Sequence, residues 1–170
     1  MSELWDILDK NRNKTGKTVL RSAFPNSSEE YHLVVHIWIR NKNGEWLISK
    51  RTPNKTEPLK WEFTGGSVLA GETGLQGALR EVKEELGIDL DTEKGTLYKS
   101  FRRDVYQDFC EVWLFEHECD IKDIVLQEDE TCDAMWASNQ TIRDMIADGN
   151  FVRLDNIQYA YDLISDNFDF

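Results

Sequence analysis

From Gly66 to Ile88 the chain reads GSVLAGETGLQGALREVKEELGI. Its second part has the spacing of an amphipathic helix, which we expect to span Thr73–Leu86 and to end at Gly87. Five apolar side chains of this helix fall within roughly 100° of arc: Leu75, Ala78, Leu79, Val82 and Leu86. The stretch therefore predicts a helix with one face in the core.

A second stripe of the same helix carries three carboxylates, on Glu81, Glu84 and Glu85. Like charges four residues apart destabilise a helix by about 0.2–0.5 kcal/mol. Acidic side chains near a helix C-terminus also oppose the helix dipole. Because a divalent cation against the stripe would remove both penalties, the pattern favours a metal site. The alternative is an ordinary solvated surface.

Two glycines, Gly74 and Gly77, lie on the carboxylate side of this helix. A glycine inside a helix costs about 1 kcal/mol relative to alanine, so a pair on one face calls for a reason. Our hypothesis is that the bare patch lets the loop 64–71, or a substrate, lie against the helix backbone.

The wider spacing resembles the Nudix box, Gly-x5-Glu-x7-Arg-Glu-U-x-Glu-Glu-x-Gly-U, where U is a bulky aliphatic residue. Every fixed position is matched: Gly66, Glu72, Arg80, Glu81, Val82, Glu84, Glu85, Gly87 and Ile88. The resemblance implies an α/β fold, namely an α/β/α sandwich with a mixed central sheet. It also implies a hydrolase that cleaves a diphosphate linkage in a nucleoside diphosphate derivative with Mg²⁺ or Mn²⁺ as cofactor.

The resemblance further assigns roles to the residues of the box. Glu81 and Glu85 would be the main metal ligands, and Glu84 a further ligand or the group that orients the attacking water. A backbone carbonyl near Gly66 would complete the coordination. Hard carboxylate oxygens are the ligands that Mg²⁺ prefers, and the cation would neutralise phosphate oxygens and acidify the water.

Other residues are expected to support the site or to act on it from outside the box. Glu72 and Arg80 read as scaffold, with an ion pair that could hold the loop to the helix. The general base in this family often lies outside the box, and the candidates here are Glu128, Glu130 and Asp133, which precede an expected short strand.

Two residues are candidates for binding the substrate. Tyr106 lies eighteen residues beyond Ile88, a place where dinucleoside-polyphosphate hydrolases of this family often carry a tyrosine that could stack on a base. It could equally be a strand residue of the core. Arg51 ends an expected strand and could meet phosphate oxygens, or be a solvated strand end.

The N-terminal hairpin and the flanking sequence also resemble the isopentenyl-diphosphate isomerase branch of the superfamily. Those isomerases place a catalytic cysteine immediately before the glycine that matches Gly66, whereas this sequence has Gly65 there. The hydrolase therefore has two alternatives. One is an isomerase-like enzyme, and the other is a non-catalytic nucleotide-sensing domain.

The rest of the chain is expected to form one Nudix domain over residues 1–170, with a hairpin extension over 1–24 and a core over 31–165. The hairpin strands are expected at Leu4–Asp9 and Lys17–Arg21. Further strands are expected at Tyr31–Arg40, Trp46–Ser49, Trp61–Val68, Gly95–Arg103, Phe109–His117 and Met135–Ala137. A helix capped by Ser138 should run to Ala147, and a last helix, Asn156–Ser165, should carry Ile157, Ala160, Tyr161 and Ile164 on one stripe.

Composition limits the partners. The 170 residues include 20 basic and 32 acidic side chains, for a net charge of −12. Such a field repels polyanions, so long nucleic acid is not expected as a partner, while a small phosphorylated substrate is compatible with a metal site. Three cysteines without C-x-x-C spacing, and no membrane segment, favour the cytoplasm. A homodimer is possible, since dimers are common in the family.

Overall fold

The computed structural model describes residues 3–25, 27–154 and 157–168. The chain divides into two compact units, each built from three segments. The first unit comprises Met1–Trp38, Thr64–Lys83 and Asp89–Phe115, and the second comprises Ile39–Phe63, Glu84–Ile88 and Glu116–Phe170. Strand β3 and helix α1 contribute residues to both units. Each unit is described by itself below.

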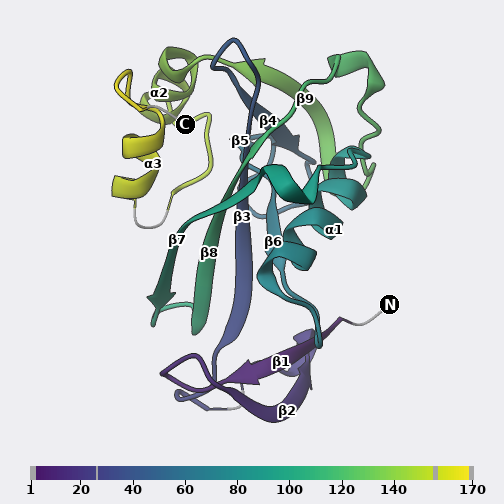
Figure 1. Ribbon diagram of the computed structural model, residues 1–170, viewed down its shortest axis with the longest axis vertical. Helices are drawn as coiled ribbons and strands as arrows, with labels where there is room; N and C mark the ends of the chain where they lie inside the picture. The colour runs from purple at the N-terminus through teal and green to yellow at the C-terminus, as the bar shows by residue number, and fades with distance from the viewer. Residues whose placement is uncertain (1–2, 26, 155–156, 169–170) are drawn as a thin grey trace. The chain divides into compact units, whose positions relative to one another are not determined.

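The first unit begins with the expected hairpin, formed by the antiparallel strands β1 (Leu4–Leu8) and β2 (Lys14–Leu20) (Figure 1). Strand β2 starts three residues earlier than the sequence predicted. The reason is a tighter turn, in which the Asp9 carboxylate accepts the backbone N–H groups of Asn11 and Asn13 at 2.8 and 2.9 Å. Such a local acceptor closes a turn without glycine.

One face of the hairpin is apolar. Its buried side chains Trp5, Ile7 and Val19 form a cluster against which Phe24 and Leu69 also pack. The hairpin therefore has its own small core within the first unit.

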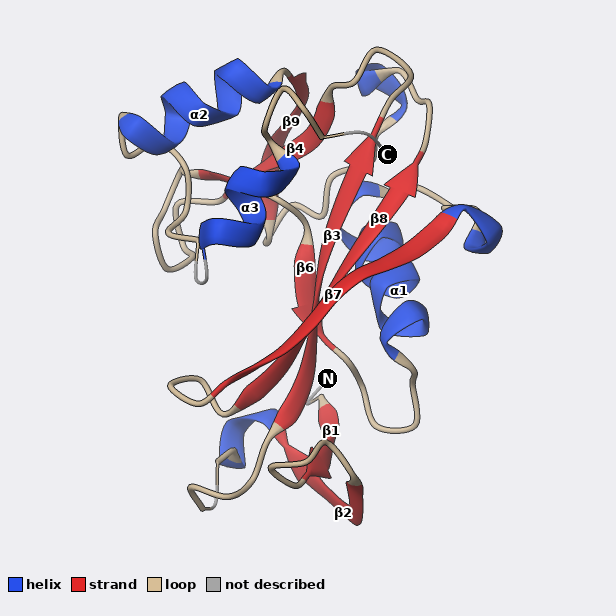
Figure 2. Cartoon of the chain, turned by 60° about the vertical axis from the view of Figure 1, so that its left-hand side comes forward, coloured by secondary structure: helices blue, strands red, loops and turns tan. Residues whose placement is uncertain are grey.

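The other strands of the first unit are arranged around β3 (His32–Arg40). Strand β6 (Gly65–Ser67) pairs with β3 in the antiparallel sense. On the other side lies β8 (Asp108–Glu116), which runs in the same direction as β3 (Figure 2). Strand β7 (Gly95–Arg103) pairs antiparallel with β8.

In the second unit, strand β4 (Trp46–Arg51) is paired antiparallel with β5 (Trp61–Glu62) and with β9 (Thr131–Ala137). The expected single strand Trp61–Val68 was wrong. The chain instead forms β5 and β6, because its two ends pair with different strands, β4 and β3. Strand β9 is also longer than the predicted Met135–Ala137, since it pairs along β4 as far as Arg51↔Thr131.

The helices of the second unit agree with the sequence in position. Helix α2 (Asn139–Ala147) is capped by Ser138, whose Oγ accepts the Thr141 N–H at 3.1 Å. Helix α3 spans Ile157–Leu163; the predicted first residue, Asn156, lies outside the described residues. The remaining short elements are the 3-10 helices η1 (Arg21–Ala23), η2 (Thr92–Lys94) and η3 (Ile121–Asp123).

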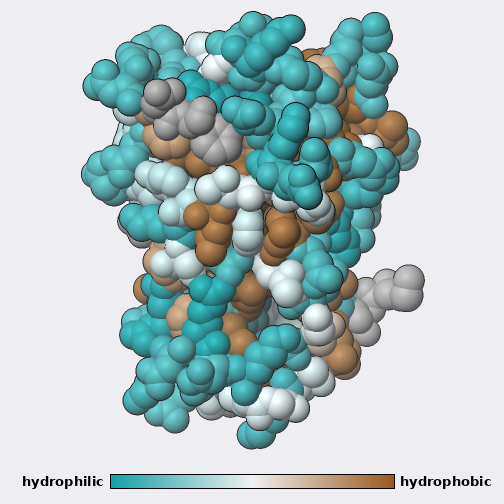
Figure 3. All heavy atoms as spheres, in the orientation of Figure 1, coloured by the Kyte–Doolittle hydropathy of each residue, from teal (hydrophilic) through white to brown (hydrophobic). Residues whose placement is uncertain are grey.

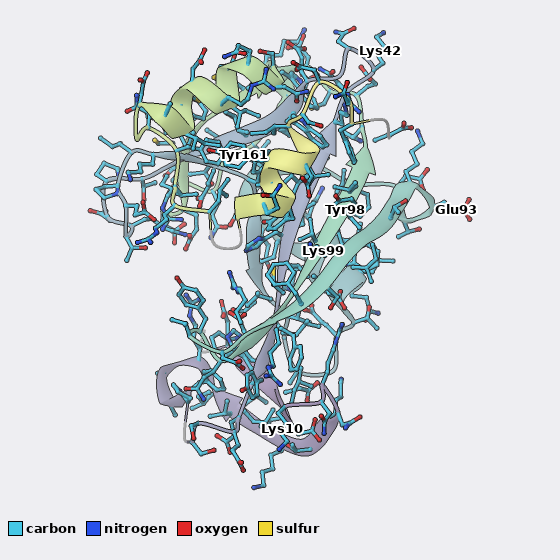
Figure 4. The ribbon with its side chains drawn as sticks, turned by 90° about the vertical axis from the view of Figure 1, so that its left-hand side faces the viewer. Lys10, Lys42, Glu93, Tyr98, Lys99 and Tyr161 are labelled. Atoms are coloured by element: carbon cyan, nitrogen blue, oxygen red, sulfur yellow. The ribbon has the colours of Figure 1, made fainter. Side chains whose placement is uncertain are left out.

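The predicted stripe of α3 was partly wrong. Ala160 and Ile164 are fully buried, but Tyr161 is 40% exposed (Figure 4). Tyr159 and Leu163 are buried in its place. The buried face is therefore centred one residue earlier on the helix than expected.

Within the described residues, the strand pairings along β3 make one mixed sheet of seven strands. The mixed α/β class and the N-terminal hairpin are therefore confirmed. Hydrophilic residues cover most of the face seen in Figure 3, as the charge of −12 suggests. No helix in the part of the chain that the structure describes is long and apolar enough to cross a membrane.

Candidate active site

Helix α1 (Gly74–Leu86) carries the candidate site and has well-defined ends. Thr73 Oγ1 accepts the Gln76 N–H at 3.2 Å, and Gln76 Oε1 accepts the Thr73 N–H at 2.8 Å. This reciprocal capping box fixes the first turn. The chain leaves the helix through Gly87, whose φ of +70° suits a residue without a Cβ.

The apolar stripe of α1 is confirmed. Ala78, Val82 and Leu86 are at most 1% exposed, and Leu75 and Leu79 are partly buried. Because this stripe is fixed in the core, the rotation of the helix is fixed, and so is the direction in which its carboxylates point.

The two glycines of α1 lie against different neighbours. A Cβ at Gly77 would come within 2.9 Å of Val68 Cγ2, so the loop 64–71 lies against the helix there, which is the first of the two arrangements expected. A Cβ at Gly74 would instead overlap the carboxylate of Glu111 on β8. Both glycines therefore permit a close approach.

The carboxylate of Glu81 lies against the backbone of Gly66. A Cβ at Gly66 would overlap the Glu81 carboxylate, with Oε2 only 2.5 Å away. The Glu81 side chain is 13% exposed. The first fixed position of the box is thus a glycine because a carboxylate of the helix occupies the space beside it.

Arg80 joins the loop to the carboxylate stripe. It donates to Glu72 Oε1 at 2.8 Å and Oε2 at 3.1 Å, to the Ser67 carbonyl at 2.8 Å and to Glu81 Oε1 at 2.8 Å. Burial would by itself raise the pKa of Glu72, but the hydrogen bonds from Arg80 and the Leu69 N–H hold it below its ordinary value. The scaffold pair expected from the sequence is therefore present.

The other two carboxylates differ in exposure. Glu85 is buried, with 8% of its surface exposed, whereas Glu84 is exposed. Glu85 lies four residues after Glu81 on α1, so the two side chains are one helical turn apart.

The comparisons with known proteins agree with this geometry. The family model described as NUDIX domain matches residues 30–155. The chain belongs to the Nudix family. An uncharacterised Nudix hydrolase of Listeria monocytogenes is 38% identical over 152 residues, covering 88% of both chains. These two matches place the chain among the Nudix hydrolases, which act on phosphoric anhydride bonds.

Solved structures share the fold. The crystal structure of DR0079 from Deinococcus radiodurans has a TM-score of 0.73 at 22% identity and covers 92% of this chain and 96% of its own. The NUDIX domain of Shewanella oneidensis NrtR, crystallised with ADP ribose, has a TM-score of 0.58 at 15% identity and covers 82% of this chain and 87% of its own. At these identities the likeness concerns the fold alone.

Beyond the Nudix box, the loop 125–130 is attached to the C-terminal end of α1. The Gln127 N–H donates to the Glu85 carbonyl at 3.1 Å, and the Val125 N–H donates to the Leu86 carbonyl at 3.0 Å. This loop lies within the second unit and satisfies carbonyls that the helix end leaves without partners. It carries two of the candidate bases.

Those candidates have different surroundings. Glu130 forms an ion pair with Lys55, while Glu128 is exposed and has no ion pair within the described ranges. Asp133 does not precede the last strand as expected. It lies inside β9, opposite Lys50, because the strand is longer than predicted.

The two candidate substrate residues already have neighbours. Arg51 donates to Glu62 at 2.5 Å and to the carbonyl and hydroxyl of Thr56 at 2.7 and 3.0 Å. Tyr106 lies in the turn between β7 and β8, is 49% exposed and has the Arg103 guanidinium 4.9 Å from its ring centre. Tyr106 is therefore neither a core residue nor part of a regular strand.

One buried polar group near the first turn of α1 was not anticipated from the sequence. Glu111 on β8 is 5% exposed and is paired with Arg12 from the hairpin turn. Its Oε2 also accepts the Trp113 Nε1–H at 2.8 Å. The available signal was Gly74, because a glycine in the first turn of α1 leaves room for another group to pack against the helix.

The donor set suits a hard divalent cation. The carboxylates of Glu81, Glu84 and Glu85 would offer oxygen ligands to such an ion, and the Gly66 backbone lies beside the Glu81 carboxylate. In the described ranges no three His, Cys, Asp or Glu side chains are already gathered into a ready-made metal cluster. The residues fit Mg²⁺ by chemistry and by position on one helix.

Proposed function

We propose that this Nudix hydrolase cleaves a diphosphate linkage in a nucleoside diphosphate derivative and requires Mg²⁺ or Mn²⁺. The observation that supports this most strongly is the buried Glu85, placed one helical turn after a Glu81 carboxylate that packs on Gly66. Carboxylate oxygens held one helical turn apart are the kind of ligand that Mg²⁺ prefers.

Glu81 and Glu85 would hold the cation, with Glu84 and the Gly66 carbonyl as further donors. When bound, the cation would neutralise phosphate oxygens and increase the acidity of a water molecule. Arg80 would keep the Glu81 carboxylate in place through its hydrogen bonds to Glu72 and Glu81. The part of the protein is thus to hold these carboxylates in position.

Glu128 is our first choice for the general base, ahead of Glu130. Its loop is held by the Glu85 carbonyl through the Gln127 N–H. A base must have its carboxylate available, and Glu130 is engaged by Lys55 while Glu128 is exposed. If this choice holds, Glu128→Gln lowers kcat more than Glu130→Gln does.

Two further residues are proposed to contact the substrate. Tyr106 is exposed enough to stack on a base; the Arg103 guanidinium 4.9 Å from its ring centre is already paired with Asp108. Arg51 could bind phosphate only by exchanging Glu62, its present partner. A nucleotide derivative of the ADP-ribose type, as bound by the NrtR domain, is one substrate class to include in assays.

We also propose that residues 1–170 act as one Nudix domain with the hairpin 1–24 as an extension, in keeping with a family match that starts at residue 30. The cytoplasmic location and the possible homodimer stay predictions. The location is supported by the three cysteines, which form no disulfide with one another.

The experiment is a turnover assay with a panel of nucleoside diphosphate derivatives, run with Mg²⁺ and with EDTA. Glu85→Gln removes the charge of the buried carboxylate, and Glu93→Gln, an exposed acid on η2 (Figure 4), is the matched control. We expect metal-dependent hydrolysis that Glu85→Gln lowers by at least about a hundredfold and the control does not. Conversion of isopentenyl diphosphate alone would favour the isomerase alternative, and saturable binding without turnover would favour a sensor.

A further inference from the structure

Two loops of the second unit meet where strands β4 and β9 come together. Loop 52–60 follows β4, and loop 125–130 leads into β9. The two strands pair as far as Arg51↔Thr131, so the start of one loop lies opposite the end of the other. Both loops belong to the second unit, as does the segment Glu84–Ile88 at the end of α1. The contacts among these three segments therefore lie within one compact unit.

The candidate base Glu128 lies in a tight turn of loop 125–130. The Gln127 carbonyl accepts the N–H groups of Glu130 at 2.9 Å and of Thr131 at 2.8 Å, which closes the turn. One side of the turn is bonded to the candidate site, because the Gln127 N–H donates to the Glu85 carbonyl at 3.1 Å. The place of Glu128 therefore depends on how firmly this turn is held.

Thr52 holds the other side of the turn through two hydrogen bonds. Its Oγ1–H donates to the Asp129 carbonyl at 3.1 Å, and its N–H donates to the Glu130 carbonyl at 3.2 Å. Thr52 is 4% exposed, although Pro53, which follows it, is exposed. A hydrogen bond that is shielded from water is electrostatically stronger than one in water. The residues on both sides of Glu128 are thus held by hydrogen bonds.

Thr52 is itself held in place. It precedes Pro53, which restricts the backbone of the residue before it to extended conformations. Its other neighbour, Arg51, donates to the carbonyl and the hydroxyl of Thr56 at 2.7 and 3.0 Å and to Glu62 at 2.5 Å. The loop that begins at Thr52 is therefore a fixed support for the turn.

An ion pair joins the same two loops at a more exposed place. Lys55 pairs with Glu130, and their side chains are 26% and 35% exposed. Water and salt weaken an ion pair of this exposure. The buried hydroxyl of Thr52 is therefore the more specific attachment of the turn that carries Glu128.

We propose that Thr52 is a positioning residue for the general base Glu128. The proposal rests on the proposed function, since it takes Glu128 as the group that accepts a proton from the attacking water. A base must lie within hydrogen-bond reach of that proton, and a displacement of about 1 Å can cost roughly a hundredfold in rate. Thr52 acts through the backbone of the turn, which it holds beside the end of α1.

The kinetic test compares two replacements of one side chain. Thr52→Val keeps the shape of the side chain and removes its hydroxyl, whereas Thr52→Ser keeps the hydroxyl and removes a methyl group. With Mg²⁺ and the substrate that the wild type cleaves best, Thr52→Val should lower kcat about tenfold with KM little changed. Thr52→Ser should retain at least about half of the wild-type kcat. An equal loss in both variants would trace the effect to packing and overturn the proposal.

A double-mutant cycle separates positioning from a general loss of structure. In a Glu128→Gln background there is no base to misplace, so Thr52→Val should lower kcat less than about twofold further. Each variant is assayed well below its Tm. If Thr52 is merely structural, the same tenfold loss will occur in both backgrounds, and that result would overturn the proposal.

The last test needs no turnover. Residue-resolved hydrogen exchange is measured for the wild type and the two Thr52 variants. In Thr52→Val the amides of Glu130 and Thr131 should exchange at least about fivefold faster, while the amide of Ile142 in α2 should be unchanged. Unchanged exchange at the turn, or equal acceleration at Ile142, would overturn the proposal. If the wild type hydrolyses nothing, the proposed function fails, while faster exchange confined to the turn would still show that Thr52 holds it.

Discussion

Gly66 and Glu81 are fifteen residues apart in the chain, yet a Cβ on the glycine would overlap the carboxylate of the glutamate. The loop and the helix of the Nudix box therefore meet at the first of the three acidic side chains. The contact explains why the box begins with glycine and why its helix carries acid on that side.

Gly66→Ala should remove most of the activity. The added methyl group would push the Glu81 carboxylate from its place, and a displacement of about 1 Å at a catalytic group can cost roughly a hundredfold in rate. The measurement is kcat/KM with Mg²⁺, with thermal unfolding as a check of folding. Ser67→Ala, on the same strand β6, adds no bulk and should keep nearly full activity. Equal activity of the two variants would show that Glu81 has no fixed role.

Arg80→Ala should lower both stability and metal affinity. Arg80 is the common partner of Glu72, Glu81 and the Ser67 carbonyl, and its loss removes a charged donor from two partly buried carboxylates. We expect a loss of about 1–3 kcal/mol, which corresponds to roughly 2–10 °C in Tm for a chain of this size. Lys83→Ala is the control, because its pair with Asp89 is exposed. A Tm change no larger than that of the control would contradict this assignment.

The two glycines of α1 should respond differently to alanine. At Gly77 the methyl group would lie 2.9 Å from Val68 Cγ2, and the gain of about 1 kcal/mol in helix propensity offsets part of the crowding. At Gly74 it would overlap the buried, ion-paired Glu111, which cannot move without losing its pair. Chemical denaturation should therefore show Gly74→Ala to be at least about 2 kcal/mol less stable than Gly77→Ala. The reverse order would mean that Glu111 is mobile.

Acid should destabilise the fold through His32. Burial lowers the pKa of His32 from 6.5 to about 4, with Arg103 and Arg21 adding to the shift, and its ring stacks on Trp5 at 4.1 Å. Because the folded pKa lies below the unfolded one, the unfolded chain takes up the proton first as the pH falls from 6.5 to 4. Stability is thus complete above pH 6.5 and decreases by about 2 kcal/mol at pH 5.

The check is the Tm of the wild type and of His32→Phe between pH 4 and 8. Phenylalanine keeps a ring on Trp5 but cannot titrate, so the variant should lose less stability toward acid. His36, whose burial lowers its pKa to about 3, continues to contribute in both proteins. Parallel curves for the two proteins would show that His32 takes no part in the acid response.

A structural feature could be predicted from the sequence when the residues that determine it lie close together along the chain. The stripe of Ala78, Val82 and Leu86 and the cap at Ser138 follow from neighbours within a few residues, and both were confirmed. The length of β9 was underestimated because it is set by pairing with β4, whose partner residues lie 80 to 91 positions earlier in the chain. The Arg12–Glu111 pair joins residues 99 positions apart and left no pattern in either segment.

The candidate site shows the same difference between features set by nearby residues and features set by distant ones. The spacing of the box identified Glu72, Arg80 and Glu81, and the structure adds the bonds between them. The candidate bases could not be ranked from the sequence, since the difference between Glu128 and Glu130 comes from Lys55 in another loop. The stripe of α3 was misjudged at Tyr161 because helical periodicity allows neighbouring choices that only packing separates.

The most direct test of the account is a titration with Mn²⁺, followed by calorimetry or by the electron paramagnetic resonance of the ion. Wild type and Glu93→Gln should bind with the same Kd, while Glu81→Gln and Glu85→Gln should each bind at least about tenfold more weakly. If all four proteins bind Mn²⁺ equally, or none binds it, the carboxylate stripe of α1 is not a metal site and the proposed mechanism fails.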